Sequence, residues 1–208
     1  MASRREFLQI GVAALALPIS VRAGLKPAVP AAAGEFAPTP LYKVIFDERH
    51  ASSRAFAGEV RKLGAPVHAI KGDITALWFN DLDARWKKDP IAIAGLTEHG
   101  PLFCLERLAW DHGMRVVYRA DHTYRPNGYM EHELSGSEQM LRDAVNLSSS
   151  GPDWSARVAS LLTRCPASRV QTSKLTVVTP GASQAGDPEH LVSWVIAPVG
   201  AARKFSRS

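Results

Sequence analysis

The first part of this chain alternates short apolar runs with amphipathic stretches, and this alternation limits the folds open to it. Four apolar runs have the length of a strand, at residues 42–47, 66–70, 91–97 and 114–119. Three stretches between them carry helix signals, at residues 54–63, 73–86 and 102–112. Strands that are apolar on both faces need cover on both sides of their sheet. The pattern therefore predicts an α/β fold, with a three-layer, mainly parallel open sheet and helices on both faces.

The second part of the chain is less regular. A strand is expected at residues 129–134, and helices are expected at 137–147 and 153–163. Two further apolar runs, 175–179 and 191–196, are separated by a region rich in glycine and proline. We expect these two runs to pair as a hairpin, which would form an antiparallel edge near the C-terminus.

The N-terminus has the pattern of a twin-arginine export signal. Arg4 and Arg5 precede Phe7 and Leu8, and the apolar run 10–17 follows at once. A membrane-spanning helix needs about 20 apolar residues, so this short run predicts a cleaved signal and no stable membrane span. Because the pathway carries folded proteins, we expect a periplasmic protein exported by the Tat translocase. The alternatives are an ordinary secretory signal and a basic start to a folded helix.

Composition divides the chain into four segments. These are the export signal at 1–23, a Pro-rich flexible linker at 24–40, a single α/β domain at 41–200 and a basic tail at 201–208. The formal net charge is +5, and the charged residues of the signal and of the tail account for all of it. The domain itself is about neutral, whereas a nucleic-acid-binding domain needs clustered basic residues. We therefore expect no nucleic-acid partner.

Several sequence motifs of stand-alone enzymes are missing. The chain has no Gly-x-Gly-x-x-Gly after its first strand, no Gly-x-x-x-x-Gly-Lys-Ser/Thr phosphate loop, no Gly-x-Ser-x-Gly elbow and no His-Glu-x-x-His. Cys104 and Cys165 do not form a Cys-x-x-Cys pair, and they are expected either as a disulfide or as two free thiols. We expect this chain to bind no cofactor and no metal.

Two polar loops follow predicted strands at positions where open α/β sheets bind ligands. The loop Asp-Glu-Arg-His at 47–50 follows the first strand, and Thr-Glu-His-Gly at 97–100 follows the third. If these strands are neighbours, His50, Glu98 and His99 converge. A histidine beside a carboxylate can transfer protons or hold a metal, so these three are the candidate catalytic residues. The alternative is that Glu98 and His99 only cap a helix and that His50 is solvated.

A second polar cluster contains histidines spaced by ten residues. Its members are Asp111-His112, Asp121-His122 and Glu131-His132-Glu133. Three histidines with carboxylates can ligate a metal, but no two of them share the i, i+4 spacing of a helix face. The favoured interpretation is a set of surface polar groups on different strands and loops. The five tryptophans are expected to anchor the core or an interface.

Two segments and the overall length carry a family resemblance. The segments are Ser-Arg-Arg-Glu-Phe-Leu at 3–8 and Gly-Leu-Thr-Glu-His-Gly-Pro-Leu-Phe-Cys-Leu-Glu-Arg at 95–107. In these the chain resembles small twin-arginine-signal accessory proteins that accompany flavin-dependent (GMC-type) alcohol dehydrogenases, of the long-chain alcohol oxidation type.

The resemblance implies an accessory subunit that binds, and helps export or activate, a larger periplasmic oxidoreductase lacking its own signal. The FAD would then belong to the partner, and no catalytic residue carries over to this chain. The alternative is a periplasmic enzyme, or a metal- or small-ligand-binding α/β protein, that uses His50, Glu98 and His99.

Overall fold

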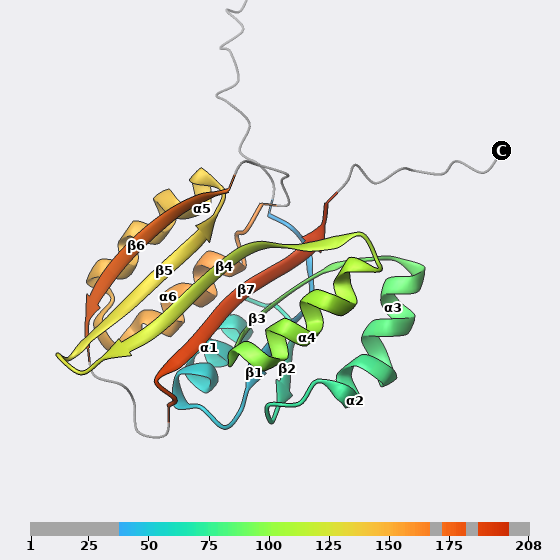
Figure 1. Cartoon of the computed structure of the whole chain (residues 1–208), viewed down its shortest axis with the longest axis horizontal. Coiled ribbons are helices and arrows are strands. Elements are labelled where there is room, and N and C mark those ends of the chain that lie inside the picture. Colours follow the sequence, from blue (N-terminus) through green and yellow to red (C-terminus); the bar gives the residue numbers. More distant parts are fainter. Residues whose placement is uncertain (1–37, 167–171, 182–186, 200–208) are drawn as a thin grey trace, which may run out of the picture. The chain divides into compact units, whose positions relative to one another are not determined.

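A seven-stranded mixed sheet organises the computed structural model, which describes residues 38–166, 172–181 and 187–199 (Figure 1). The strands lie in the order β2-β1-β3-β7-β4-β5-β6. Their bounds are β1 Leu41–Asp47, β2 Val67–Ile70, β3 Ala92–Thr97, β4 Met114–Arg125, β5 Tyr129–Gly136, β6 Ser173–Pro180 and β7 His190–Pro198. The expected α/β class is confirmed. The expected export signal, the basic tail and most of the expected linker lie outside the described residues.

Parallel pairing is confined to one side of the sheet. Strand β1 pairs in parallel with β2 and β3, and the other four pairings are antiparallel. Strand β4 runs in the same direction as β3, but the antiparallel strand β7 lies between them. The sheet is therefore parallel in its first three strands and antiparallel in the rest, which is less parallel than the alternation predicts.

The prediction that the last two strands pair as a hairpin is wrong. Strand β6 forms the sheet edge and pairs with β5, whereas β7 lies in the middle of the sheet. The physical reason is burial: β7 buries every residue from Leu191 to Ala197, while β6 alternates between exposed and covered positions. A strand that is apolar on both faces is stable only inside a sheet with cover on both sides.

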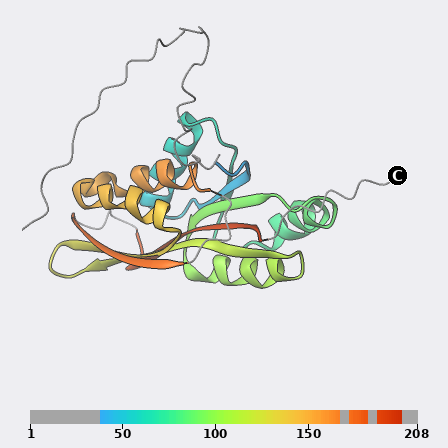
Figure 2. The ribbon, with the colours of Figure 1, turned by 90° about the horizontal axis from the view of Figure 1, so that it is seen from above.

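Helices pack against the sheet in two groups (Figure 2). The first apolar cluster contains residues of α1 (Ala51–Lys62), α5 (Glu138–Ala144) and α6 (Trp154–Leu162). The second contains residues of α2 (Thr75–Leu77), the π-helical turn η1 (Trp78–Leu82), α3 (Asp83–Lys88) and α4 (His99–Trp110). Two 3₁₀ turns, η2 (Val145–Ser149) and η3 (Gly151–Asp153), join α5 to α6.

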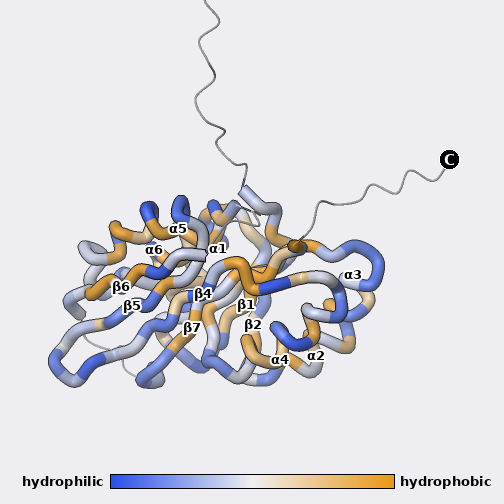
Figure 3. Tube along the Cα trace, turned by 45° about the horizontal axis from the view of Figure 1, so that its top comes forward, coloured by the Kyte–Doolittle hydropathy of each residue, from blue (hydrophilic) through white to orange (hydrophobic). Residues whose placement is uncertain are grey.

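Strand β1 shows how the two clusters share the sheet. Val44 and Phe46 belong to the first cluster, and Ile45 between them belongs to the second. Successive side chains of a strand point to opposite faces, so one apolar run supplies both cores. Figure 3 shows hydrophobic residues concentrated along β1 and β7, in the middle of this arrangement.

A close contact between β3 and β7 depends on a glycine. Gly95 lies opposite Trp194, and a Cβ atom at Gly95 would lie 2.5 Å from Cζ2 of that indole and 2.7 Å from the carbonyl oxygen of Ile45. Only a residue without a side chain leaves room there. The indole Nε1 of Trp194 donates to Oγ1 of Thr97 at 3.2 Å, which fixes the ring beside the end of β3.

Two expected elements differ in extent. Helix α4 begins at His99, earlier than expected, and carries Pro101 in its first turn, where a backbone N–H is not needed. Strand β4 continues to Arg125 and forms a hairpin with β5. Within the described part of the chain, no helix is long and apolar enough to span a membrane.

Candidate functional site

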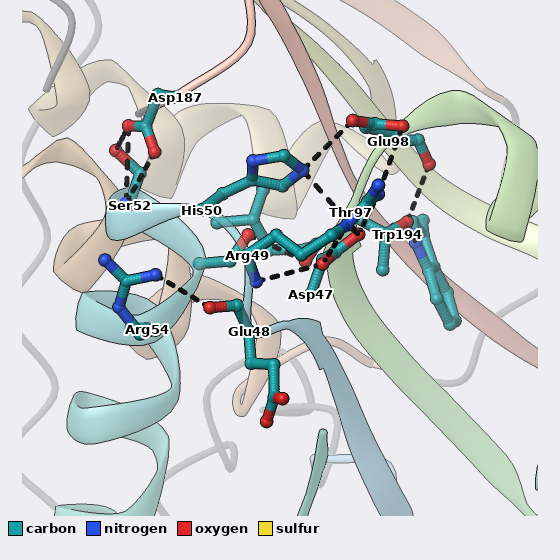
Figure 4. A network of polar contacts seen from close by, with 12 residues as sticks. Asp47, Glu48, Arg49, His50, Ser52, Arg54, Thr97, Glu98, Asp187 and Trp194 are labelled. Atoms are coloured by element: carbon teal, nitrogen blue, oxygen red, sulfur yellow. Dashed lines mark hydrogen bonds and ion pairs between the residues drawn. The ribbon is translucent and has the colours of Figure 1, made fainter. Parts of the chain in front are cut away.

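The carboxyl ends of β1 and β3 lie side by side and bring two polar loops together (Figure 4). Strand β1 ends at Asp47, and the loop through His50 leads into α1. Strand β3 ends at Thr97, and Glu98 is the N-cap of α4. Because the two strands are parallel neighbours, their ends meet at one edge of the sheet, where open α/β sheets bind ligands.

His50 and Glu98 meet at this edge. His50 Nε2 lies 3.1 Å from Oε1 of Glu98 and 3.6 Å from Oδ2 of Asp47. The imidazole is buried, with 7% of the residue exposed, whereas Glu98 is partly open to solvent. A carboxylate held beside an imidazole orients the ring, and such a pair can accept or donate a proton.

Arg49 connects the two carboxylates of the site. Its Nε donates to Oδ1 of Asp47 at 2.9 Å, and its Nη2 lies 2.6 Å from Oδ2 of Asp47 and 3.3 Å from Oε2 of Glu98. Burial of Asp47 acts to raise the pKa of its carboxyl group, but hydrogen bonds from Arg49 outweigh burial and lower this pKa. The hydrogen bond with Asp47 in turn raises the pKa of Arg49. Asp47 and Arg49 are not among the three candidate residues expected from the sequence, although polar residues directly after a buried strand are the signal for them.

His99 does not join the site. It is the first residue of α4 and is exposed, and its ring stacks on Phe103 with the ring centroids 6.1 Å apart. Successive residues of a helix point about 100° apart, so Glu98 and His99 cannot both face His50 once the helix begins at His99. The three-residue convergence expected from the sequence is therefore reduced to two residues.

A depression of about 350 Å³ lies at the end of β2, next in the sheet to β1. Glu48, Lys71 and Asp73 contribute polar groups to its lining, and Ile70 and Leu77 contribute apolar ones. The guanidinium of Arg49 lies across Gly72, where a Cβ atom would lie 2.5 Å from Nη2. Gly72 also has a φ of +81°, so two constraints favour glycine at this turn.

The first turn of α1 is closed by a carboxylate from a distant segment. The backbone N–H of Ser52 donates to Oδ1 of Asp187 at 3.0 Å, and the Ser52 hydroxyl also donates to Asp187. A carboxylate at this position satisfies free N–H groups and stabilises the helix dipole. The position where an open α/β sheet often holds a ligand anion is thus filled by the chain itself.

The second histidine cluster is a buried pair rather than a set of surface groups. His122 on β4 lies directly opposite His132 on β5, and both rings are buried. Their Nδ1 atoms are 2.7 Å apart, and both rings contact the indole of Trp154. His112 does not belong to this pair, since its ring packs against Trp78 and Trp86.

Asp121, another member of the expected cluster, also lies apart from the buried histidine pair. Asp121 lies on the opposite face of β4 from His122, where it accepts hydrogen bonds from Arg119 and contacts His190 at 3.0 Å. Over residues 38–166, 172–181 and 187–199, no three His, Cys, Asp or Glu side chains form a group that could hold a metal ion. Both cysteines are free thiols, Cys104 exposed and Cys165 buried.

An exposed ridge on α4 combines aromatic and basic side chains. We call Phe103, Arg107 and Trp110, together with Arg115 at the start of β4, the α4 ridge. Phe103 is 47% exposed and Trp110 is 42% exposed. The guanidinium carbon of Arg107 lies 5.2 Å from the Phe103 ring centre and 4.2 Å from that of Trp110, and Arg115 approaches Trp110 at 5.8 Å. Such cation–π contacts hold exposed side chains in place.

Comparisons with models of known protein families, with curated proteins and with solved structures found no match for this chain.

Proposed function

We propose that this chain is an accessory subunit exported to the periplasm by the Tat translocase together with a larger oxidoreductase that lacks its own signal. The chain binds that partner and helps its export or activation. The sequence support is the pattern of Arg4 and Arg5 followed by Phe7 and Leu8. The family resemblance adds that the partner carries FAD and oxidises an alcohol.

The α4 ridge is the observation in the folded domain that favours a partner. Tryptophan and arginine are enriched among the residues that dominate protein interfaces, and adjoining exposed apolar side chains mark interaction sites more than single ones do. Arg107 is already held between Phe103 and Trp110, so less side-chain freedom is lost on binding. The ridge therefore offers a preorganised apolar centre with positive charge, which suits a partner surface that carries carboxylates around an apolar patch.

Co-purification from native cells tests this proposal. The full-length chain is isolated with its bound proteins, which are identified by mass spectrometry and assayed for alcohol oxidation. We expect one larger oxidoreductase that turns over substrate, and no turnover by this chain alone. Trp110→Ala should weaken binding of that partner at least tenfold, because truncating a central aromatic anchor commonly costs 2 kcal/mol or more, with about 1.4 kcal/mol per tenfold.

Tyr129→Ala provides the matched control. Tyr129 is an aromatic residue of similar exposure, at 43%, but it lies on β5 rather than on α4. Its removal should leave partner binding unchanged. Equal loss of binding in Trp110→Ala and Tyr129→Ala would contradict the assignment of the ridge, and turnover by the chain alone would contradict the accessory role.

A second candidate function rests on the contact between His50 and Glu98. An oriented imidazole at the carboxyl ends of parallel strands favours a periplasmic enzyme or a small-ligand- or metal-binding protein, and Glu48 of the same loop lines a depression. Titration with inorganic phosphate and with Zn²⁺, followed by NMR of the histidine rings, tests it. Saturable shifts of His50 that are lost in Glu98→Gln would favour this function, and their absence would argue against it.

The finer fold class also remains a proposal of ours. Two apolar clusters, with residues from different helices, support three layers in which the sheet lies between helices.

A further inference from the structure

A continuous chain of buried polar groups crosses four adjacent strands. Ser193 on β7, His122 on β4, His132 on β5 and Thr179 on β6 are all buried on one face of the sheet. His122 Nε2 lies 2.7 Å from the Ser193 hydroxyl, and His132 Nε2 lies 3.1 Å from the Thr179 hydroxyl. With the 2.7 Å contact between the two Nδ1 atoms, every ring nitrogen of the pair has one partner.

The positions of the protons in this chain of hydrogen bonds follow from its Thr179 end. The Thr179 hydroxyl donates its single proton to the backbone carbonyl of Leu147 in η2 at 2.7 Å, so it must accept from Nε2–H of His132. A neutral His132 then has a bare Nδ1, which accepts from Nδ1–H of His122. His122 in turn has a bare Nε2, which accepts from the Ser193 hydroxyl. In this arrangement every contact is satisfied while both imidazoles are neutral.

An added proton has no favourable place in this chain of buried hydrogen bonds. If it enters at His122 Nε2, the Ser193 hydroxyl must turn and accept instead of donating. If it enters at His132 Nδ1, two N–H groups face each other across 2.7 Å unless His122 changes its tautomer and Ser193 turns its hydroxyl away. In either case a positive charge lies in a buried site. Burying a charge is costly unless an opposite charge accompanies it.

No carboxylate is paired with the two histidines, by an ion pair or a hydrogen bond, in the part of the chain that the structure describes. In the apolar cluster on this face the titratable groups are the phenols of Tyr118 and Tyr124 from β4 and the thiol of Cys165 after α6. His190 on β7 also acts electrostatically on His122. From the helix side the pair meets the Trp154 ring of α6 and, through Thr179, the Leu147 carbonyl of η2.

We propose that His122 and His132 form an acid-sensitive latch, which holds η2 and α6 against β4, β5 and β6 and opens when the pair takes up a proton. The neutral chain of hydrogen bonds joins the four strands to η2, and protonation leaves a positive charge buried within it. The latch shares no residue with the contact between His50 and Glu98 or with the α4 ridge. It therefore stands independently of the proposed function.

The direction of the pH effect is fixed by burial. Desolvation, followed by the nearby His132 and His190, lowers the pKa of His122 well below its ordinary value, and desolvation lowers that of His132 to about 4. The unfolded chain takes up these protons near the ordinary pKa of about 6.5. The latch therefore carries no penalty above pH 6.5 and weakens progressively as the pH falls from 6.5 toward 4.

Hydrogen exchange of the full-length chain, corrected for the intrinsic pH dependence, tests the latch. Between pH 7 and pH 5 we expect protection of peptides from β4, β5 and α6 to fall at least tenfold, because each withheld proton changes the opening constant by up to tenfold per pH unit. Peptides from β1 and α1 should keep their protection over this range. Unchanged protection in β4 and β5, or an equal loss in β1 and α1, would overturn the latch.

Two variants separate the pair from other histidines. His122→Gln/His132→Gln keeps amide donors and acceptors but cannot titrate, so the pH dependence in β4 and β5 should disappear. His99→Gln removes an exposed histidine and should keep it. Nitrogen-15 NMR of wild-type rings at pH 7 gives a reading that needs no variant: the proton should lie on Nδ1 of His122 and on Nε2 of His132. A charged ring, or the same tautomer at both, would overturn the proposal.

Discussion

Removal of the Arg49 side chain tests the electrostatics of the β1–β3 edge. Asp47 is fully buried, and Arg49 supplies three side-chain hydrogen bonds to it, at 2.6, 2.9 and 3.2 Å. Arg49→Ala removes the guanidinium from the buried carboxylate. The backbone N–H of residue 49, at 3.1 Å, would still donate to Asp47, and His50 Nε2 would still lie 3.6 Å from its Oδ2.

The structure sets the size of the expected loss. Removing one partner of a fully buried ion pair costs roughly 3 to 5 kcal/mol. The Arg49 side chain is 43% exposed, so water can enter the vacated space and screen Asp47. We therefore expect Arg49→Ala to lower the free energy of unfolding by about 2 kcal/mol at pH 7.5.

The loss should depend on pH. In the wild type, the pKa of Asp47 is lowered, so its contribution is present above the ordinary pKa near 3.8 and is lost as the pH falls through the lowered value. Without Arg49, burial raises the pKa of Asp47, and the penalty is relieved as the pH falls through that raised value. The difference between variant and wild type should therefore shrink between pH 7.5 and pH 4. The effect of the buried histidine pair is common to both proteins and cancels.

Urea denaturation at pH 7.5 and pH 4 measures this difference. Lys87→Ala is the control, since it removes an exposed i, i+4 pair with Asp83 and should cost about 0.5 kcal/mol or less. The reasoning is refuted if Arg49→Ala costs no more than Lys87→Ala at pH 7.5, or if its cost is the same at both pH values.

Three further predictions use separate parts of the structure. Gly95→Ala should lower stability by about 1 to 3 kcal/mol in urea denaturation, because the new methyl group meets the Trp194 ring and a backbone oxygen; an unchanged midpoint would contradict the close contact. Asp187→Ala should cost about 1 kcal/mol in the same assay through loss of the carboxylate at the first turn of α1, and a neutral effect would contradict that role. Cys104 is exposed and should react with a thiol reagent in the native protein at neutral pH, while Cys165 should react only on unfolding, because burial raises its pKa to about 12; two reactive thiols, or none, would be inconsistent with this arrangement.

Much of the fold follows from local sequence signals. The seven strands and the main helices lie where apolar runs and helix signals predict them, because periodicity and turn residues act over short distances. Strand order depends on pairings between distant segments, which these signals do not report. The apolar run of β7 did contain a clue, since continuous burial on both faces is a property of central strands.

The two histidine sites show the same division. His50 and Glu98 could be expected to meet because each follows the end of a strand, and parallel neighbours bring such ends together. The pair of His122 and His132 was missed because the strand was expected to end at residue 119. Beyond that point Ala120 and His122 continue the buried face of β4, so alternation persists if histidine is counted as a buried residue.

The location of the partner in cells tests the central claim most directly. Replacing Arg4 and Arg5 by lysine should block recognition of the signal while leaving the folded domain unchanged. After fractionation of native cells, we predict that this chain and its larger oxidoreductase partner both remain in the cytoplasm, and that periplasmic alcohol oxidation is lost. If every oxidoreductase still reaches the periplasm in full amount while this chain is retained, the accessory role is contradicted.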